Sequence, residues 1–184
     1  MDYSRARTLK KFRVPGFTLV ELMIVIAVLA ILLALAAPSF ERSIATNRMS
    51  GQANQLLLAM QVARTEALKR RQPVAVCSSA NQTSCGGTWA QGWIVVTDDN
   101  AAGDGSVDVD DVLRVWEGLR GNLLFDDAGS LPGFVRFLPD GRADAAAGTF
   151  PLEFLVQLPG CRFDIGREVD ITATGRAHVR EVNC

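Results

Sequence analysis

The feature that most constrains this chain is a run of sixteen uninterrupted apolar residues from Leu22 to Ala37, which Pro38 closes. Counted from Phe17, the segment is 21 residues long and contains one ionisable side chain, that of Glu21. A helix needs about 20 residues to cross a hydrocarbon layer about 30 Å thick. The sequence therefore predicts a membrane-spanning helix, because the favourable insertion of many Leu, Ile and Val residues outweighs the cost of one acid near the helix end.

The charges on either side of this segment predict its orientation. Five basic side chains and one aspartate precede residue 17, whereas the whole chain of 184 residues has a net charge of −1, so the remainder is acidic. The positive-inside rule then places the N-terminus in the cytoplasm and the bulk of the chain on the opposite side of the membrane. The alternative is a secretory signal that is removed after the small residues 34–37, but such signals usually have a shorter apolar core of about 7–15 residues.

A second helical pattern follows Pro38 and differs from the first in having only one apolar side. Its apolar residues recur at alternating steps of four and three, which is typical of an amphipathic helix. Pro73 lacks an amide hydrogen and disfavours helical geometry in the preceding residue, so we expect the helix to end near Gln72. The stripe consists of Met49, Ala53, Leu56, Met60, Ala63 and Ala67, and Leu57 and Leu68 widen it.

Beyond Pro73 the helical period disappears, and short strand-like runs separated by Gly and Pro turns take its place. One amphipathic helix and an antiparallel sheet must cover each other, because neither buries its apolar face alone. The sequence therefore predicts an α+β headpiece. The expected strands are residues 74–77, 92–97, 112–116, 134–138, 152–157 and 169–182.

The start of the apolar segment carries a resemblance to a known class of proteins. Residues 15–22 read Pro-Gly-Phe-Thr-Leu-Val-Glu-Leu, which resembles the class III leader of type IV pilins and type II secretion pseudopilins. The resemblance implies that a prepilin peptidase cleaves between Gly16 and Phe17, and that the new amine of Phe17 is then N-methylated. It also implies that Glu21 is the carboxylate used in assembly and that Pro38 kinks the helix.

Physical chemistry supports a role for Glu21 independently of that resemblance. An ionisable group in a spanning helix normally has a partner. In a filament of packed helices, the free amine of Phe17 on a neighbouring subunit can supply it. The alternative is a Glu21 side chain that lies close enough to the membrane interface to stay solvated.

Parts of the headpiece resemble the H-type pseudopilin domain that is shared by GspH, FimT and FimU. The similar stretches are residues 112–115, residues 134–143 and Thr174-Gly175-Arg176. The resemblance implies the pilin fold, in which one long N-terminal helix packs on an antiparallel sheet. It divides the chain into a leader (1–16), a transmembrane assembly helix (17–38), the amphipathic half of the same helix (39–72) and a β-rich headpiece (73–184).

The function that this resemblance implies is structural. We expect a minor pilin or pseudopilin near the tip of a type II secretion or type IV pilus filament, acting in protein secretion or pilus assembly. Its partners are then other pilin subunits, the prepilin peptidase and the inner membrane, with the headpiece in the periplasm.

Four cysteines, Cys77, Cys85, Cys161 and Cys184, lie on the side of the membrane that is predicted to be oxidising. An even number in such a compartment favours disulfides, and four cysteines allow three pairings. We favour Cys77 with Cys85 and Cys161 with Cys184, since neighbouring partners suit hairpin connections. Buried free thiols are the alternative.

Residues 98–111 contain six aspartates and invite comparison with a calcium-binding loop. An EF-hand needs oxygen ligands at alternating positions, glycine at the sixth position and glutamate at the twelfth, and this stretch does not have that spacing. We therefore expect a solvated hairpin loop. A zinc site is also not expected, because the chain has one His and no C-x-x-C pair.

Near the C-terminus, Arg176, His178 and Arg180 are expected on one face of a strand, because side chains alternate with period two. Gly175 and Arg176 resemble the start of a Gly-Arg-x-Arg motif with which some FimT proteins bind DNA, but His178 stands in place of the second arginine. DNA binding in natural transformation is thus the alternative function, with residues 69–71 extending the patch. The competing interpretation is a solvated edge strand.

Catalytic patterns are missing from the sequence. His178 is the single imidazole, and neither G-x-S-x-G nor H-E-x-x-H occurs. We therefore expect that the chain is not an enzyme and that it has no cofactor, no metal and no small-molecule substrate. A membrane-anchored enzyme is kept as the third hypothesis.

Overall fold

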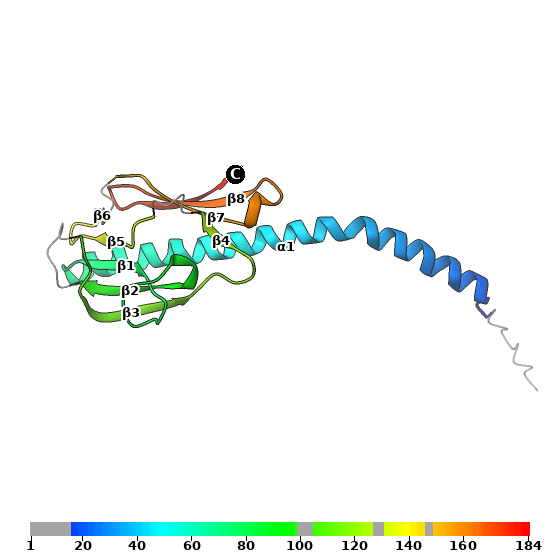
Figure 1. Ribbon diagram of the computed structural model, residues 1–184, viewed down its shortest axis with the longest axis horizontal. Coiled ribbons are helices and arrows are strands. Elements are labelled where there is room, and N and C mark those ends of the chain that lie inside the picture. The colour runs from blue at the N-terminus through cyan, green and yellow to red at the C-terminus, as the bar shows by residue number, and fades with distance from the viewer. Residues whose placement is uncertain (1–15, 99–104, 127–130, 146–148) are drawn as a thin grey trace, which may run out of the picture. The chain divides into compact units, whose positions relative to one another are not determined.

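The computed structural model describes residues 16–98, 105–126, 131–145 and 149–184 (Figure 1). The chain begins with one long helix, α1 (Leu19–Arg70), and all later elements are strands or short 3₁₀ turns. Two compact units divide the chain between Glu41 and Arg42, and α1 contributes to both.

The second half of α1 is the amphipathic helix that the apolar stripe predicts. All six stripe residues, from Met49 to Ala67, are at most 1% exposed, which confirms the stripe. Ala59 joins them, whereas Leu68 is 47% exposed, so the prediction that Leu68 widens the stripe is wrong. The helix ends at Arg70 because Arg71 adopts a left-handed φ of 58° two residues before Pro73.

The first sheet has five antiparallel strands in the order β3-β2-β1-β5-β6. β1 pairs with β2 on one side and with β5 on the other, so it is the central strand. The 3₁₀ turn η1 (Trp89–Gln91) leads into β2. The strands are β1 (Val74–Ser78), β2 (Gly92–Asp98), β3 (Val109–Glu117), β5 (Phe134–Phe137) and β6 (Ala143–Ala145).

The second sheet has four antiparallel strands in the order β4-β7-β8-β9, a separation that the sequence did not predict. The single run expected over residues 169–182 is wrong: it is a hairpin whose turn contains Gly175 at a φ of 74°, a value that favours glycine. The turn η2 (Pro159–Cys161) connects β7 to β8. The strands are β4 (Leu124–Asp126), β7 (Leu152–Gln157), β8 (Gly166–Ile171) and β9 (Ala177–Val182).

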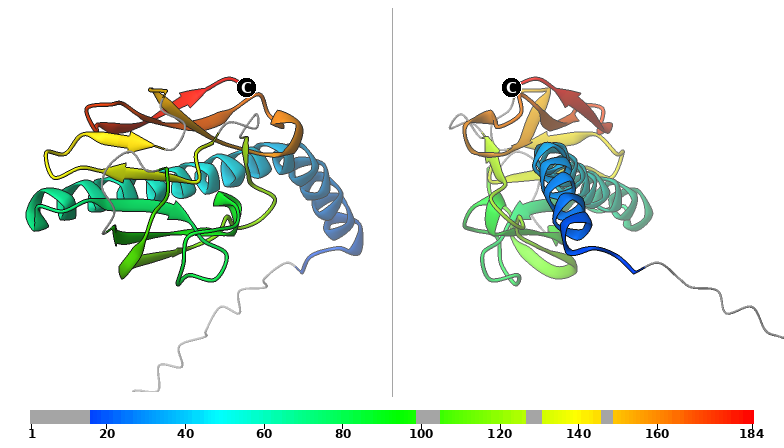
Figure 2. Two further views of the ribbon diagram at one scale, coloured as in Figure 1. Left: turned by 60° about the vertical axis from the view of Figure 1, so that its left-hand side comes forward. Right: turned by 90° about the vertical axis from the view of Figure 1, so that its right-hand side faces the viewer.

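The main core forms where α1 lies between the two sheets (Figure 2). Stripe residues of α1, inward residues of both sheets and an aromatic group around Phe154 make up this cluster. The Phe154 ring meets Trp89 edge-on at 5.0 Å and Phe125 at 6.4 Å between centroids. A smaller cluster around Ile94 and Phe134 covers the opposite face of the five-stranded sheet. The helix is therefore the shared inner layer of the headpiece.

Candidate functional site

The segment predicted to be processed lies immediately before α1. Gly16 and Phe17 are exposed and non-helical, and Phe17 is 77% exposed. The backbone N–H of Glu21 donates a hydrogen bond to Thr18 Oγ1 at 3.2 Å, so Thr18 acts as the N-cap of the helix. Thr18 and Glu21 thus have the spacing of a capping box, and Glu21 lies in the first turn, where a negative charge is favourable.

The apolar half of α1 has no covering partner in the described chain. Its large apolar side chains from Leu19 to Leu35 are between 51% and 74% exposed. One 18-residue window has a mean hydropathy of 3.0 and no buried residue, which makes α1 long and apolar enough to cross a membrane. A helix that is apolar on every side is stable where lipid or other helices surround it.

The four cysteines form two disulfides in the structure, in the pairing that the sequence favours. Cys77 in β1 bonds to Cys85 in the following loop, with their Cα atoms 5.5 Å apart. Cys161 in η2 bonds to the C-terminal residue Cys184, with a Cα separation of 5.8 Å. The second bond ties the end of the chain to the loop between β7 and β8.

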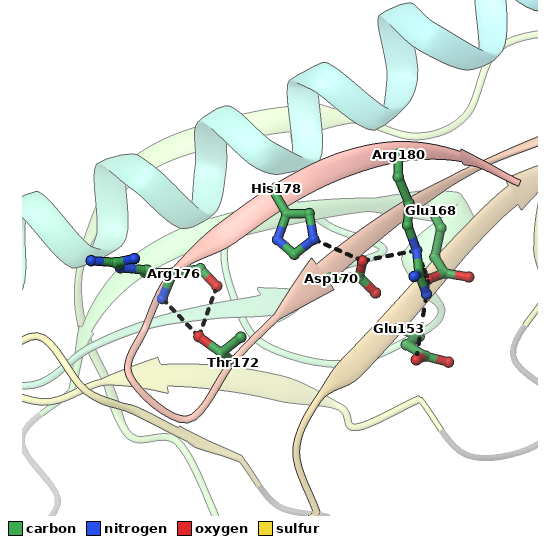
Figure 3. A network of polar contacts seen from close by, with 7 residues as sticks. All are labelled: Glu153, Glu168, Asp170, Thr172, Arg176, His178 and Arg180. Atoms are coloured by element: carbon green, nitrogen blue, oxygen red, sulfur yellow. Dashed lines mark hydrogen bonds and ion pairs between the residues drawn. The ribbon is translucent and has the colours of Figure 1, made fainter.

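A network of charged side chains lies on the outer face of the four-stranded sheet, the face that points away from α1 (Figure 3). Arg167 of β8 donates from Nε to Ser50 Oγ of α1 at 2.9 Å, so its neighbours Glu168 and Asp170 point outward. The register of β8 with β9 then places Asp170 opposite His178 and Glu168 opposite Arg180.

Arg180 is at the centre of this network. Its Nε lies 2.8 Å from Glu168 Oε1 and 3.0 Å from Asp170 Oδ2, and its Nη2 also contacts Glu168 and lies 3.8 Å from Glu153 Oε1. The hydrogen bond with Glu168 and the charge of Asp170 raise the pKa of Arg180 above its ordinary value. The carboxylate oxygens of Glu153, Glu168 and Asp170 lie within 4.8 Å of one another, and the guanidinium is the cation that they share.

Asp170 is the most buried member of the network. Its side chain is 6% exposed and its Oδ2 lies 3.1 Å from His178 Nε2. Burial and the nearby Glu168 together raise the pKa of Asp170 to about 6, although Arg180 and His178 act in the opposite direction. The network as a whole is therefore rich in negative charge, which disfavours a phosphate at Arg180.

Arg176 precedes β9, so the prediction that it shares a strand face with His178 and Arg180 is wrong, although it lines a hollow together with His178. It lies in the turn before β9, where its backbone N–H donates to Thr172 Oγ1 at 3.3 Å, and Figure 3 shows its guanidinium pointing away from the carboxylates. A hollow of about 280 Å³ lies beside this turn and is lined by Arg176, His178 and Arg64 of α1, among others. Arg64 is already engaged, because it donates to Gly141 O at 3.0 Å and to Thr174 O at 3.2 Å.

The acidic stretch 98–111 differs from the solvated loop that the sequence predicts; its residues 99–104 lie outside the described chain. Asp98 is buried, and its Oδ2 accepts a hydrogen bond from Arg136 Nε of β5 at 2.6 Å, with both side chains fully buried. Arg136 also donates to the carbonyl of Ser106 and lies 3.4 Å from Asp144. This ion pair fixes the start of the acidic stretch to the sheet.

Sequence reasoning missed the residues that neutralise the basic ones. Glu168 and Asp170 alternate in the sequence with buried residues, and this pattern alone indicates one charged face of a strand. Finding their partners requires the pairing of β8 with β9, which the undivided run 169–182 concealed. Asp98 and Arg136 are 38 residues apart, and no local pattern links them.

Comparison with known proteins gives two family matches. Residues 52–175 match the model of the family described as Type II transport protein GspH. Residues 12–37 match the prokaryotic N-terminal methylation motif. No curated protein matches the chain.

A solved structure supports the same fold. The type IV minor pilin FimU of Pseudomonas aeruginosa superposes with a TM-score of 0.53 at 21% identity, over 73% of this chain and 90% of FimU. The minor pseudopilin EpsH of the Vibrio cholerae type 2 secretion system gives a TM-score of 0.49 at 12% identity, over 72% of this chain and 96% of EpsH. The long helix packed on antiparallel sheets is thus the pilin fold, as predicted. The expectation that the chain is not an enzyme agrees with its match to a family of transport proteins.

Proposed function

Because the chain belongs to the GspH family of type II transport proteins, we propose that it is a minor pilin or pseudopilin, a structural subunit near the tip of a type II secretion or type IV pilus filament. The observation that carries this proposal is the exposed apolar half of α1, directly preceded by Gly16 and Phe17. Such a segment requires a partner from outside the chain, and a filament of packed helices or a lipid bilayer provides one.

In this proposal, the prepilin peptidase removes residues 1–16 on the cytoplasmic side of the inner membrane, and Phe17 becomes the methylated N-terminus. The anchor is kept, and the headpiece lies in the periplasm. Glu21 then pairs with the amine of Phe17 on a neighbouring subunit. Its position supports this, because no described side chain pairs with its carboxylate and the helix start brings it close to Phe17.

The proposal is tested by replacing Glu21 with Val in the full chain and following two properties separately. We expect the variant to be extracted only by detergent, as the parent is, but to be lost from the filament fraction. Glu21→Asp keeps the charge and serves as the matched control. Normal incorporation of Glu21→Val would contradict the role assigned to this carboxylate.

Processing is tested by changing Gly16 to Leu. The bulkier residue should block cleavage, so that the mass of the chain still includes residues 1–16, whereas the parent should begin at a methylated Phe17. A variant that is shortened in the same way as the parent would contradict the assigned cleavage site.

A second candidate function is DNA binding by the headpiece, and one observation favours it. Arg176 is exposed and lines a hollow with Arg64 and His178, which places three basic groups together. Arg180 does not contribute, because three carboxylates surround it. A salt-dependent DNA shift assay on the detergent-solubilised chain tests this function: binding should weaken in Arg176→Ala and persist in Arg180→Ala, and absence of binding by the parent excludes it.

A further inference from the structure

A second cavity lies at the free edge of the five-stranded sheet, away from the charged network. It has a volume of about 750 Å³ and lies between residues 48–55 of α1 and the end of β3. This volume is within the usual range for ligand pockets, about 300–1,000 Å³. β3 pairs with β2 alone among the described strands, so its other side presents main-chain N–H and C=O groups.

The cavity contains a buried polar atom that nothing in the described chain satisfies. Gln52 of α1 is 7% exposed, and its Oε1 has no hydrogen-bond partner. A buried carbonyl oxygen without a donor is costly, typically by about 1–3 kcal/mol. Since Gln52 lines the cavity, a ligand with an N–H or O–H group is the simplest way to satisfy this atom.

Two arginines give the same cavity a positive character. Arg48 is exposed and makes no hydrogen bond or ion pair with another described residue, and a Cβ at Gly121 would lie 3.5 Å from its Nη1. Arg120 pairs with Glu117 at 2.5 Å, but both side chains are more than two-thirds exposed. Such an exposed pair contributes little and exchanges readily. Together the arginines leave one positive charge for an incoming anion.

A ligand that fits must therefore combine an anionic group with a hydrogen-bond donor and must be able to lie along a strand edge. An extended peptide with an Asp or Glu side chain has all three properties, because its backbone supplies the N–H groups. A phosphodiester has the charge, but it cannot pair with a strand edge through backbone N–H and C=O groups. The chemistry of the cavity favours an acidic peptide over a nucleic acid or a lipid phosphate.

We propose that this cavity binds an extended acidic segment of a neighbouring pilin-type subunit, with a carboxylate of that segment at Arg48 and a backbone N–H at Gln52 Oε1. The proposal rests on the proposed function, since it needs a filament. The neighbour in this proposal is a different pilin-type chain, and capture of a second copy is an outcome of the test.

A photocrosslinker tests the proposal in cells that make the full chain and its filament. Gln55 is exposed and lines the cavity, so it is replaced by p-benzoylphenylalanine. After irradiation, the filament fraction is digested and the captured peptide is sequenced by mass spectrometry. We expect a peptide of another pilin-type chain that contains Asp or Glu.

Charge variants then decide whether Arg48 holds that peptide. Removing one partner of an interfacial charge pair weakens the contact, so Arg48→Glu and Arg48→Gln should lower capture by about tenfold. Arg48→Lys should keep most of it, and Arg42→Glu, which changes an exposed arginine of the same helix outside the cavity, should have no effect. Changing the captured acidic residue to Lys should restore capture by Arg48→Glu.

The remaining outcomes overturn the proposal. The first is capture of a non-acidic peptide, a second copy of the chain, lipid or nucleic acid. The second is capture by Arg48→Glu at the level of the parent. The third is no capture although the chain is present in the filament fraction. A chain that is absent from that fraction even without the crosslinker contradicts the proposed function itself, and the inference then fails with it.

Discussion

The two halves of α1 belong to one helix, and they differ in where their partners lie. Large apolar side chains from Leu19 to Leu35 are between 51% and 74% exposed, whereas those of the stripe between Met49 and Ala67 are at most 1% exposed. The first half is apolar on all sides, and the second is apolar on one. A helix that is apolar on all sides must be covered by lipid or by other molecules, whereas a helix with one apolar stripe is covered by the two sheets of its own chain.

The same difference holds for the ionised groups. In the headpiece, Asp98 has a buried partner in Arg136. In the first half, no described side chain pairs with Glu21. The core of the headpiece is thus packed and charge-paired within the chain, whereas the N-terminal half is built for contacts that another molecule completes.

The largest expected effect concerns the buried ion pair. Arg136→Ala leaves Asp98 buried without its partner, which should lower the free energy of unfolding by about 3–5 kcal/mol. Arg114→Ala, which removes an exposed arginine of β3, is the matched control and should change it by less than about 0.5 kcal/mol. Denaturant unfolding of the full chain in detergent micelles measures both. An equal effect of the two substitutions would show that the pair is not a stabilising contact.

The next effect compares the two halves of α1 directly. Leu56→Ala removes a fully buried side chain and should destabilise the headpiece by about 2–5 kcal/mol. Leu32→Ala makes the same chemical change at a side chain that is 58% exposed, and the headpiece should keep its stability. Thermal unfolding followed by tryptophan fluorescence distinguishes them. Destabilisation by Leu32→Ala would mean that the two halves are not independent.

A smaller effect depends on pH. The pKa of Asp170 is raised to about 6 from 3.8, so the folded chain binds a proton between about pH 6 and pH 4 that the unfolded chain does not bind. The contribution of Asp170 to stability therefore falls as pH rises through 6. Asp170→Asn removes this dependence. Because Arg180 offsets part of the burial cost, we expect the pH-dependent part of the free energy of unfolding to differ between parent and variant by about 1 kcal/mol. Comparing the unfolding of parent and variant at pH 5 and pH 7.5 measures it, and parallel pH profiles would contradict the assignment.

The smallest effect lies at the start of α1. Thr18→Ala removes the hydroxyl that caps the backbone N–H of Glu21, which should cost the first turn about 1 kcal/mol. Thr18→Ser keeps the hydroxyl and should behave like the parent. Amide hydrogen exchange at residues 20–22 in micelles reports the local change, while the headpiece should be unaffected. Equal exchange in the two variants would exclude a capping role.

Much of the fold could be predicted because its signals are local. The stripe from Met49 to Ala67 recurs with the helical period, and β2 is long enough to show its β-branched composition. β4 and β6 were missed because three residues carry no detectable period. The division into two sheets was missed because it depends on which strands pair, and pairing is a long-range property.

The polar contacts were less predictable for the same physical reason. The local sequence indicates a free cation at Arg180, since Glu181 is the one acidic residue beside it. Its partners Glu153 and Glu168 lie 27 and 12 residues earlier and reach it only through the register of three strands. The cavity residue Gln52 carries no signal at all, because an unsatisfied amide is visible only after the core is packed.

The burial of the stripe inside the headpiece has a mechanical consequence. Tension applied to the helix within the headpiece reaches both sheets through the stripe that begins with Met49. Because the stripe runs along the helix, the load is shared in shear by many side chains at once. A pull along the helix axis must therefore break many buried contacts together before the helix leaves the headpiece.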